Sequence, residues 1–189
     1  MTNIVVIAGS WRQGSLNHSL AKAAIDLAPA GCTATLETIR DIPVYDGDSE
    51  AATGIPPAVA RLKDVVAASD GLLLVTPEYN NSMPGSFKNA IDWMSRPPKD
   101  SPRVFRGRPV AITGATDGMA GTRLSQAAWL PVFRTLGMQF WSGRMLFVAG
   151  ASKVFDGGGT LVDPTVRDLL TKFMAEFAAF VGRNSPNKT

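Results

Sequence analysis

Segments of nearly continuous apolar residues alternate along this chain with segments in which apolar residues recur every three or four positions. The apolar segments 3–8, 72–75 and 110–113 are typical of strands that are buried on both faces of a parallel sheet. A weakly alternating segment at 33–39 predicts another strand, and the segment 138–141 is expected to begin a fifth. The hydrophobic pattern therefore predicts five strands.

The segments between the strands carry apolar residues at helical spacing, so that each has one apolar face. Helices are predicted at 16–27, 56–69, 84–94, 126–136 and 166–180. The last has the strongest apolar stripe, which favours a helix that covers the sheet. Pro131 lies inside the fourth helix, where its missing N–H and its ring are expected to cause a kink.

Strands that alternate with helices indicate a parallel sheet with helices on both faces. A dinucleotide-binding Rossmann unit would carry G-x-G-x-x-G after the first strand, and residues 9–14 lack that spacing. The P-loop signature with its lysine is also absent from the sequence. We therefore predict a flavodoxin-like three-layer α/β sandwich, whose five-stranded parallel sheet has the order 2-1-3-4-5.

The remaining segments are expected to be irregular. Residues 40–48 carry turn chemistry, 96–103 are rich in proline, and 156–159 form a glycine-rich turn. The polar tail 183–189 is expected to be disordered, which leaves 1–182 as a single domain.

The composition, with 45% hydrophobic and 19% charged residues, is that of an ordinary soluble globular protein. The net charge of +3 comes from scattered basic residues and does not indicate a nucleic-acid partner. Cys32 is the only cysteine, which excludes an intramolecular disulfide and a cysteine-cluster metal site. His18 is the only histidine and is expected at the surface, so a histidine-based metal site or a catalytic triad has little support. Neither a signal peptide nor a membrane-spanning run is recognisable, so no membrane insertion and a cytoplasmic location are expected.

The first candidate site is the polar loop between the first strand and the first helix, Gly9-Ser-Trp-Arg-Gln-Gly-Ser-Leu-Asn17. A loop of this kind directs backbone N–H groups and a helix N-terminus at one point, where anions bind well. Ser10, Ser15 and Asn17 add neutral donors, and Arg12 adds a charged one. Two interpretations fit the loop equally well: a phosphate cradle, or a helix start that Ser15 caps.

Two further polar loops follow the third and fourth predicted strands. Glu78-Tyr-Asn-Asn-Ser82 places polar groups and one aromatic ring at the carboxyl end of a central strand, which is where open α/β sheets bind ligands. The second loop, Gly114-Ala-Thr-Asp-Gly-Met-Ala-Gly121, is rich in glycine. In the predicted strand order these loops converge with the first one on a single ligand.

These motifs resemble a known family. Residues 9–17 are similar to the phosphate loop G-S-x-R-x-x-S-x-N of the NAD(P)H-dependent FMN reductase family. Residues 77–93, PEYNNSMPGSFKNAIDW, resemble that family's longer and more specific motif P-E-Y-N-x-S-x-P-G-x-x-K-N-A-I-D-W. The resemblance covers nearly the whole chain, and the family includes quinone, chromate and azo-dye reductases.

The resemblance implies FMN as the cofactor and assigns its contacts. The phosphate is expected to bind the side chains of Ser10, Arg12, Ser15 and Asn17 and the backbone of Trp11 and Leu16. The isoalloxazine ring is expected to lie against Pro77, Glu78, Tyr79 and Asn80, with Thr116 as a contact from the third loop. Ser82 either binds the cofactor or caps the following helix, and the main chain of Glu78 is expected to matter more than its charge.

The activity that the resemblance implies is an NAD(P)H oxidoreductase with a ping-pong mechanism. Hydride passes from the nicotinamide through FMN to quinones, free flavin, azo compounds or metal oxyanions, and no catalytic side chain is required. The choice between NADPH and NADH stays open, with Arg12, Arg96 and Arg123 as candidates for binding a 2′-phosphate. A homodimer or homotetramer is expected.

Two alternatives belong to other functional classes. A flavodoxin-type electron carrier is disfavoured because the sequence lacks the T-x-T-G-x-T phosphate loop and is not acidic. A redox-sensing regulator finds little support in the basic tail. Two departures from the family pattern are Trp11, which bears on access to the site, and Pro131, which bears on a subunit contact.

Overall fold

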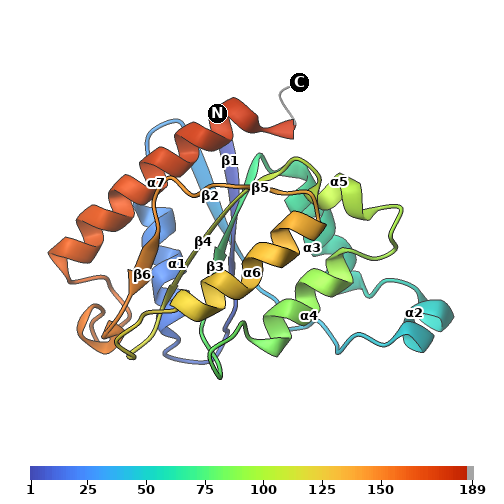
Figure 1. The fold of residues 1–189 in the computed structure, drawn as a ribbon, viewed down its shortest axis with the longest axis horizontal. Helices are drawn as coiled ribbons and strands as arrows, with labels where there is room; N and C mark the ends of the chain where they lie inside the picture. The colour runs from blue at the N-terminus through green and yellow to red at the C-terminus, as the bar shows by residue number, and fades with distance from the viewer. Residues whose placement is uncertain (187–189) are drawn as a thin grey trace.

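The structure is a computed structural model that describes residues 1–186. Its centre is a sheet of parallel strands in the order β2-β1-β3-β4-β5, with β6 also paired to β4 (Figure 1). The strands are β1 (Thr2–Ala8), β2 (Cys32–Glu37), β3 (Gly71–Val75), β4 (Pro109–Ala115), β5 (Gln139–Phe140) and β6 (Leu146–Val148). The predicted order 2-1-3-4-5 is confirmed.

Helices cover both faces of the sheet, which confirms the predicted three layers. One face carries α1 (Leu16–Asp26) and α7 (Pro164–Asn184), and the other carries α3 (Pro57–Ala68), α4 (Gly85–Met94) and α6 (Arg123–Thr135). Three short helices lie in the connections: α2 (Gly47–Thr53), α5 (Ser101–Phe105) and the 3₁₀ helix η1 (Ala151–Lys153).

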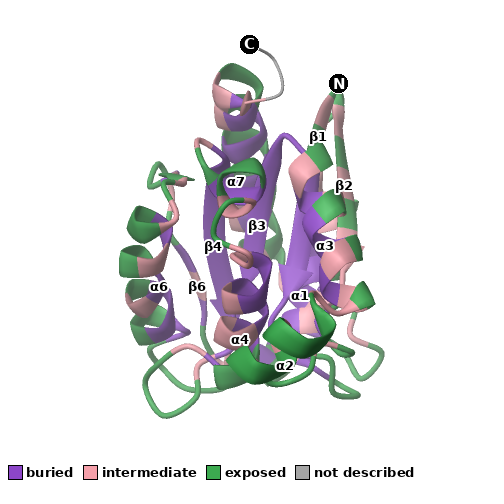
Figure 2. Cartoon of the chain, turned by 90° about the vertical axis from the view of Figure 1, so that its right-hand side faces the viewer, coloured by how far each residue is buried: buried purple, intermediate pink, exposed green. Residues whose placement is uncertain are grey.

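The apolar strands supply two cores, one on each side of the sheet. In β1, Val5 and Ile7 pack with α3, α4 and α6, whereas Ile4 and Val6 pack with α1 and α7. Successive side chains of a strand point to opposite faces, so a strand that is covered twice needs a continuous apolar run. Figure 2 shows the sheet buried between its two helical layers.

The fifth position of the sheet differs from its prediction, because two short strands share it. β5 pairs with Pro109 and Val110, and β6 pairs with residues 113–115. Between them the Trp141 indole is buried in the α7 core, 5.0 Å from the ring of Phe173. The chain turns over this indole at Gly143, where a Cβ would approach the indole Nε1 to 2.6 Å. The predicted strand at 138–141 therefore stops early, and β6 had not been predicted.

Two short helices lie in segments that were expected to be irregular. The predicted loop 40–48 ends in the first residues of α2, since Asp46 caps this helix by accepting the N–H groups of Asp48 at 2.7 Å and Ser49 at 3.1 Å. α5 overlaps the end of the proline-rich segment 96–103. The helix tolerates Pro102 because this residue lies in the first turn, where a missing N–H costs nothing.

The carboxyl-terminal prediction is wrong at its boundary. α7 continues to Asn184, so the tail expected from residue 183 does not begin there. Ser185 is buried, and its hydroxyl donates to Asp70 at 2.6 Å, which holds the helix end against the start of β3. The rest of the expected tail, residues 187–189, lies outside the described residues.

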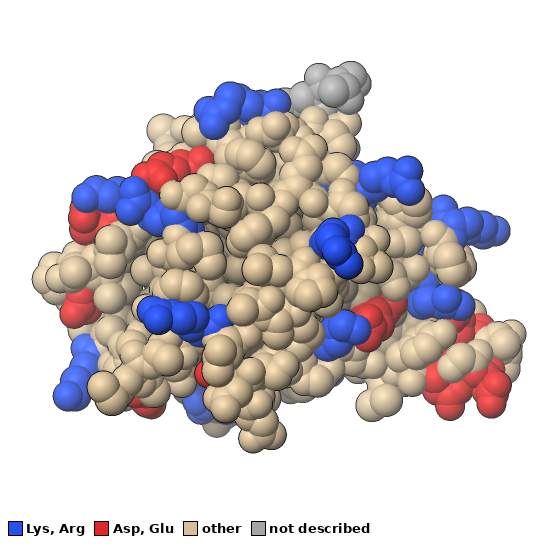
Figure 3. Space-filling view, viewed as in Figure 1, with Lys and Arg blue, Asp and Glu red and all other residues tan. Residues whose placement is uncertain are grey.

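Charged side chains of both signs are interspersed on the face in Figure 3, and acidic side chains gather over α2 at the lower right. Within residues 1–186, no helix combines the length and apolarity that crossing a membrane requires. The parallel strands end at one edge of the sheet, the lower edge in Figure 1, and there the loops after the neighbouring strands β1, β3 and β4 lie side by side.

Candidate active site

Three loops meet at the carboxyl edge of the sheet around a cavity of about 170 Å³, here called the site cavity. Its lining is Ser10, Arg12, Ser15, Leu16, Asn17, Pro77, Glu78, Tyr79, Ala115, Thr116 and Asp117. Most of the residues singled out in the sequence therefore surround one space. Ala115 and Asp117 were not singled out, although their position directly around Thr116 was a usable signal.

The loop after β1 ends in an open helix N-terminus. Ser15 is the N-cap of α1, and its Oγ accepts the N–H of His18 at 3.2 Å. Within residues 1–186, the N–H groups of Leu16 and Asn17 donate to no protein acceptor. Ser15 therefore caps the helix, as one interpretation expected, and the first turn keeps two donors that are compatible with the phosphate cradle, which stays a prediction.

Asn17 ties two walls of the cavity together. Its side-chain Nδ2 donates to the carbonyl of Ala115 at 2.8 Å, and its Oδ1 accepts the N–H of Ala115 at 2.9 Å. The side chain is buried, 5% exposed, so these bonds are shielded from water. This amide positions the loops by joining the start of α1 to the end of β4.

The loop after β3 is a tight turn that presents Tyr79. The backbone N–H and carbonyl groups of Tyr79 and Ser82 bond to each other at 3.0 Å, and Asn80 and Asn81 both have positive φ values, 49° and 60°. Asparagine tolerates this left-handed conformation better than most residues. Tyr79 stands 50% exposed at the cavity rim. Asn80 and Ser82 form the turn without lining the site cavity, and α4 begins at Gly85 with Pro84, not Ser82, as its N-cap.

Glu78 has a structural partner that its sequence context did not reveal. One carboxylate oxygen accepts the backbone N–H of Leu124 at 2.8 Å and that of Ser125 at 2.9 Å. These N–H groups belong to the first turn of α6, where a negative charge is stabilising. The carboxylate therefore holds the β3 loop against α6 and is not simply solvated.

The loop after β4 is held by the segment that follows β6. The N–H of Thr116 donates to the carbonyl of Val148 at 3.0 Å, and its carbonyl accepts the N–H of Ala151 at 3.2 Å. Asp117 accepts the N–H of Ser152 at 2.6 Å, and the bonds from Ser152 lower the pKa of Asp117. The unpredicted β6 and η1 thus support the wall that contains Thr116.

A larger cavity of about 640 Å³ adjoins the site cavity and shares Ser10, Arg12, Ser15 and Leu16 with it. We call it the basic groove, because Arg12, His18, Lys22 and Arg40 line it. Trp11 lies here, 37% exposed, rather than in the site cavity. Burial, together with the neighbouring positive charge of Lys22, lowers the pKa of His18. His18 is half-buried, although the sequence suggested a surface position.

The strand order defines the class, a flavodoxin-like α/β protein, and the site cavity lies at the carboxyl edge of the sheet, where open α/β sheets bind ligands. The chain matches the model of the NADPH-dependent FMN reductase family over residues 2–153. It is 38% identical over 180 residues to an NAD(P)H-dependent FMN reductase of Pseudomonas aeruginosa, which covers 95% of this chain and 95% of that protein.

Two further similarities cover nearly the whole chain. A 2-hydroxy-1,4-benzoquinone reductase of Burkholderia sp is 36% identical over 178 residues, which are 94% of this chain and 95% of that protein. The solved structure of the flavoenzyme NAD(P)H:(acceptor) oxidoreductase FerB from Paracoccus denitrificans has a TM-score of 0.87 at 32% identity, covering 98% of this chain and 100% of that one. The chain therefore belongs to the NADPH-dependent FMN reductase family, as its two motifs predicted, and is an enzyme of that class.

Proposed function

We propose that this enzyme holds FMN in the site cavity and carries electrons by a ping-pong mechanism from NAD(P)H to quinones, free flavin, azo compounds or metal oxyanions. The observation that carries the proposal is the cavity itself, in which an open helix N-terminus and two polar loops surround one space. The relatives named for FMN and benzoquinone reduction support the same reaction class.

The residues of the cavity fit a flavin phosphate. Leu16 and Asn17 offer unpaired N–H groups, and Ser10 and Ser15 offer hydroxyl groups that are only 7% and 4% exposed, counting the whole residues. Arg12 adds a positive charge at the same loop. A dianion at this point gains from the helix dipole as well as from the donors.

The other two loops fit the flat ring. Pro77 and Tyr79 offer an apolar and aromatic wall, and the backbone around Thr116 forms the opposite side of the cavity. Bound FMN would supply the redox chemistry, accepting a hydride from the nicotinamide and passing two electrons to the acceptor. The chain itself would bind and orient the cofactor and would hold the loops in place. Glu78 holds the β3 loop through its bond to α6, and Asn17 joins the start of α1 to Ala115. We therefore name no side chain as acid or base.

The test begins with flavin binding. FMN and riboflavin carry the same ring, but only FMN carries the phosphate, so we expect FMN to bind at least tenfold more tightly in a fluorescence titration. Equal binding of the two flavins would contradict the role given to the α1 N-terminus.

The second stage distinguishes the reductase from the flavodoxin-type carrier. The FMN-loaded protein is titrated anaerobically with NADPH and then with NADH, and a quinone is injected last. We expect the flavin band to bleach directly to the two-electron state and to return with the quinone. A flavin that neither nicotinamide reduces, or that gives a long-lived neutral semiquinone, would favour the electron carrier.

Three earlier predictions stay predictions at this point. Direct contacts from Trp11, Asn80 and Ser82 to the cofactor require a complex to test, because these residues lie outside the site cavity. The homodimer or homotetramer is checked by light scattering of the FMN-loaded protein. The cytoplasmic location is checked by fractionation of the producing cells.

A further inference from the structure

The basic groove is larger than the binding of one flavin phosphate requires. Its volume of about 640 Å³ lies in the range of small-molecule sites, about 300–1,000 Å³. It extends from the phosphate loop over one face of α1, past His18 and Lys22, to the glycine turn at 157–159. Because it shares four lining residues with the site cavity, one extended ligand can occupy both spaces.

Within residues 1–186, the positive charges of the groove are not neutralised by ion pairs, and Arg12 donates to the backbone carbonyl of Gln13 at 3.3 Å. Of the described residues, no carboxylate forms an ion pair with Arg12, Lys22 or Arg40. Arg40 makes one hydrogen bond, from its guanidinium to the carbonyl of Trp11 at 3.2 Å, which leaves its charge uncompensated. Arg12 also serves the flavin phosphate in the proposed function, so Lys22 and Arg40 are the two cations of this concave surface that favour a second anionic ligand.

The two acidic residues of the groove are already occupied. Glu37 pairs with Arg61 at 2.6 Å on its outer side. Asp156 accepts the N–H groups of Gly158 at 2.9 Å and Thr160 at 2.8 Å, which shapes the turn. Glu37 and Asp156 therefore have other partners, and among the described residues neither forms an ion pair with Lys22 or Arg40.

The ends of the groove are suited to different parts of a nucleotide. Trp11, within the phosphate loop, is 37% exposed as a whole residue and lines the groove, so it offers a surface on which a flat base can stack. At the far wall, Gly159 approaches α1 so closely that a Cβ there would lie 2.6 Å from the Ser19 Oγ, whereas Gly157 has open space around it. The proposed function assigns the N–H groups of Leu16 and Asn17 to the flavin phosphate, which leaves Lys22 and Arg40 for a second anion.

We propose that the basic groove binds the phosphorylated adenosine end of NADPH, with Lys22 and Arg40 as the residues that recognise its 2′-phosphate and Trp11 as the surface for its base. The proposal rests on the proposed function and adds to it a preference for NADPH over NADH. It replaces Arg96, whose guanidinium pairs with Glu50 at 2.8 Å, and Arg123, whose guanidinium lies over the Phe147 ring, as candidates for this phosphate. Of the three arginines first considered, Arg12 remains in the groove.

The test measures binding without turnover. Adenosine 2′,5′-bisphosphate and adenosine 5′-monophosphate differ only in the 2′-phosphate, and each is titrated calorimetrically into the FMN-loaded protein, where the flavin phosphate already fills the α1 N-terminus. We expect the bisphosphate to bind at least tenfold more tightly. The variant Lys22→Gln should reduce this ratio several-fold, since Lys22 has no structural bond among residues 1–186.

Two controls make the result specific. Arg134→Gln removes the same charge from the exposed last turn of α6, outside both cavities, and should leave the ratio unchanged. Arg40→Lys keeps the charge and should retain most of the preference. Equal affinities in the unmodified protein, or an unchanged ratio in Lys22→Gln, would overturn the proposal.

Two further outcomes are distinguishable. If inorganic phosphate binds as tightly as the bisphosphate and loses affinity equally in Lys22→Gln, the groove is a plain anion site and the nucleotide proposal is wrong. If the protein fails to take up FMN, the proposed function fails, and that is seen in the flavin spectrum before any nucleotide is added. Conversely, an FMN-loaded protein with no preference for the bisphosphate overturns only the groove proposal.

Discussion

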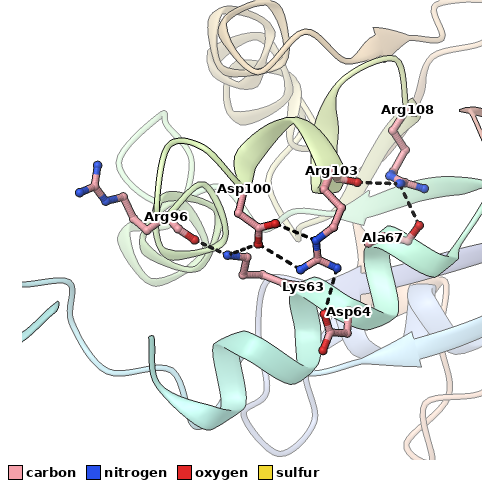
Figure 4. Close-up of polar contacts among 7 residues, drawn as sticks. All are labelled: Lys63, Asp64, Ala67, Arg96, Asp100, Arg103 and Arg108. Carbon is pink, nitrogen blue, oxygen red and sulfur yellow. Dashed lines mark hydrogen bonds and ion pairs between the residues drawn. The ribbon is translucent and has the colours of Figure 1, made fainter. Parts of the chain in front are cut away.

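The two ends of the sheet use similar charged residues in opposite ways. At the carboxyl edge, Arg12, Lys22 and Arg40 line a groove without ion pairs to described residues. Beside the amino-terminal ends of β3 and β4, Lys63, Asp64, Asp100 and Arg103 between α3 and α5 form a connected set of ion pairs (Figure 4). Basic residues that gather in a cavity without ion pairs favour a ligand there, whereas the paired ones between α3 and α5 stabilise the fold.

The paired network is centred on Asp100. Its carboxylate binds Lys63 at 2.8 Å and Arg103 at 2.8 Å, and Arg103 also binds Asp64 at 2.9 Å (Figure 4). Lys63 is almost fully buried and also donates to the carbonyl of Arg96. The bonds from Arg103 and Lys63 hold the pKa of Asp100 well below its usual range.

Arg108, next to this network, is a buried arginine whose charge is satisfied by backbone carbonyls. It is 2% exposed, and its guanidinium donates to the carbonyls of Val104 at 2.6 Å, Ala67 at 3.1 Å, Arg103 at 3.4 Å and also Ser69. Burial lowers its pKa to about 10, so it stays charged at neutral pH. These carbonyls lie near the ends of α3 and α5, where a cation is favourable.

The largest effect is expected from Arg108→Ala. The change leaves several buried carbonyls without a donor and creates a cavity, so the free energy of unfolding should fall by about 3–5 kcal/mol. Urea unfolding followed by circular dichroism measures it. Arg61→Gln, which breaks the ion pair of a half-exposed side chain, should cost no more than about 1 kcal/mol. An equal loss of unfolding free energy in both variants would contradict the larger stabilisation that we assign to the buried bonds of Arg108.

The next effect is expected from Asn17→Ala at the opposite edge. Loss of its two bonds to Ala115 should lower the free energy of unfolding by about 2 kcal/mol and weaken FMN binding about tenfold, because the loops are no longer tied together. Thermal unfolding and flavin titration measure the two effects. In the control Asn184→Ala, a bond to Phe180 at the end of α7 is lost, and FMN affinity should not change.

A smaller effect is expected from Glu78→Gln. The amide oxygen can still accept the N–H groups of α6, but the negative charge at the helix N-terminus is lost, at a cost of about 0.5–1 kcal/mol. The matched variant Asp163→Asn removes the capping charge of α7, outside both cavities. Both should destabilise similarly in urea, while only Glu78→Gln should alter flavin affinity. A flavin effect in both would argue against the role of Glu78 in positioning its loop.

The smallest effect concerns acid stability. Because the folded-state pKa of Asp100 lies below its ordinary value of 3.8, the carboxylate stabilises the protein above that pH and loses this contribution as the pH falls below it. The unmodified protein should therefore exceed Asp100→Asn in melting temperature at pH 6 by more than at pH 3. Asp41→Asn, which changes an exposed carboxylate outside the helices that forms no ion pair with a described residue, should show a much smaller difference between the two pH values. The same difference in melting temperature at pH 6 and pH 3 between the unmodified protein and Asp100→Asn would contradict the lowered pKa of Asp100.

The sequence predicted the sheet order and the two loop motifs because these depend on local pattern. Continuous apolar runs in β1, β3 and β4 indicate strands covered on both faces, and the parallel order then brings their following loops to one edge. The split of the fifth strand was not predictable, since it depends on the Trp141 indole reaching the rings of α7.

The roles of single site residues were decided by tertiary structure. Asn17 was expected to hold phosphate through its side chain, which stays a prediction, and the structure adds that this amide binds Ala115, which lies 98 residues away along the chain. Glu78 was expected to matter through its main chain, but its carboxylate also caps a helix 46 residues further on. A polar side chain in a motif can bond a ligand or the protein, and the distant partner that decides this is absent from the local pattern. The sequence determined which polar groups are available at the edge of the sheet, and only the folded chain decided which of them are left unpaired for a ligand.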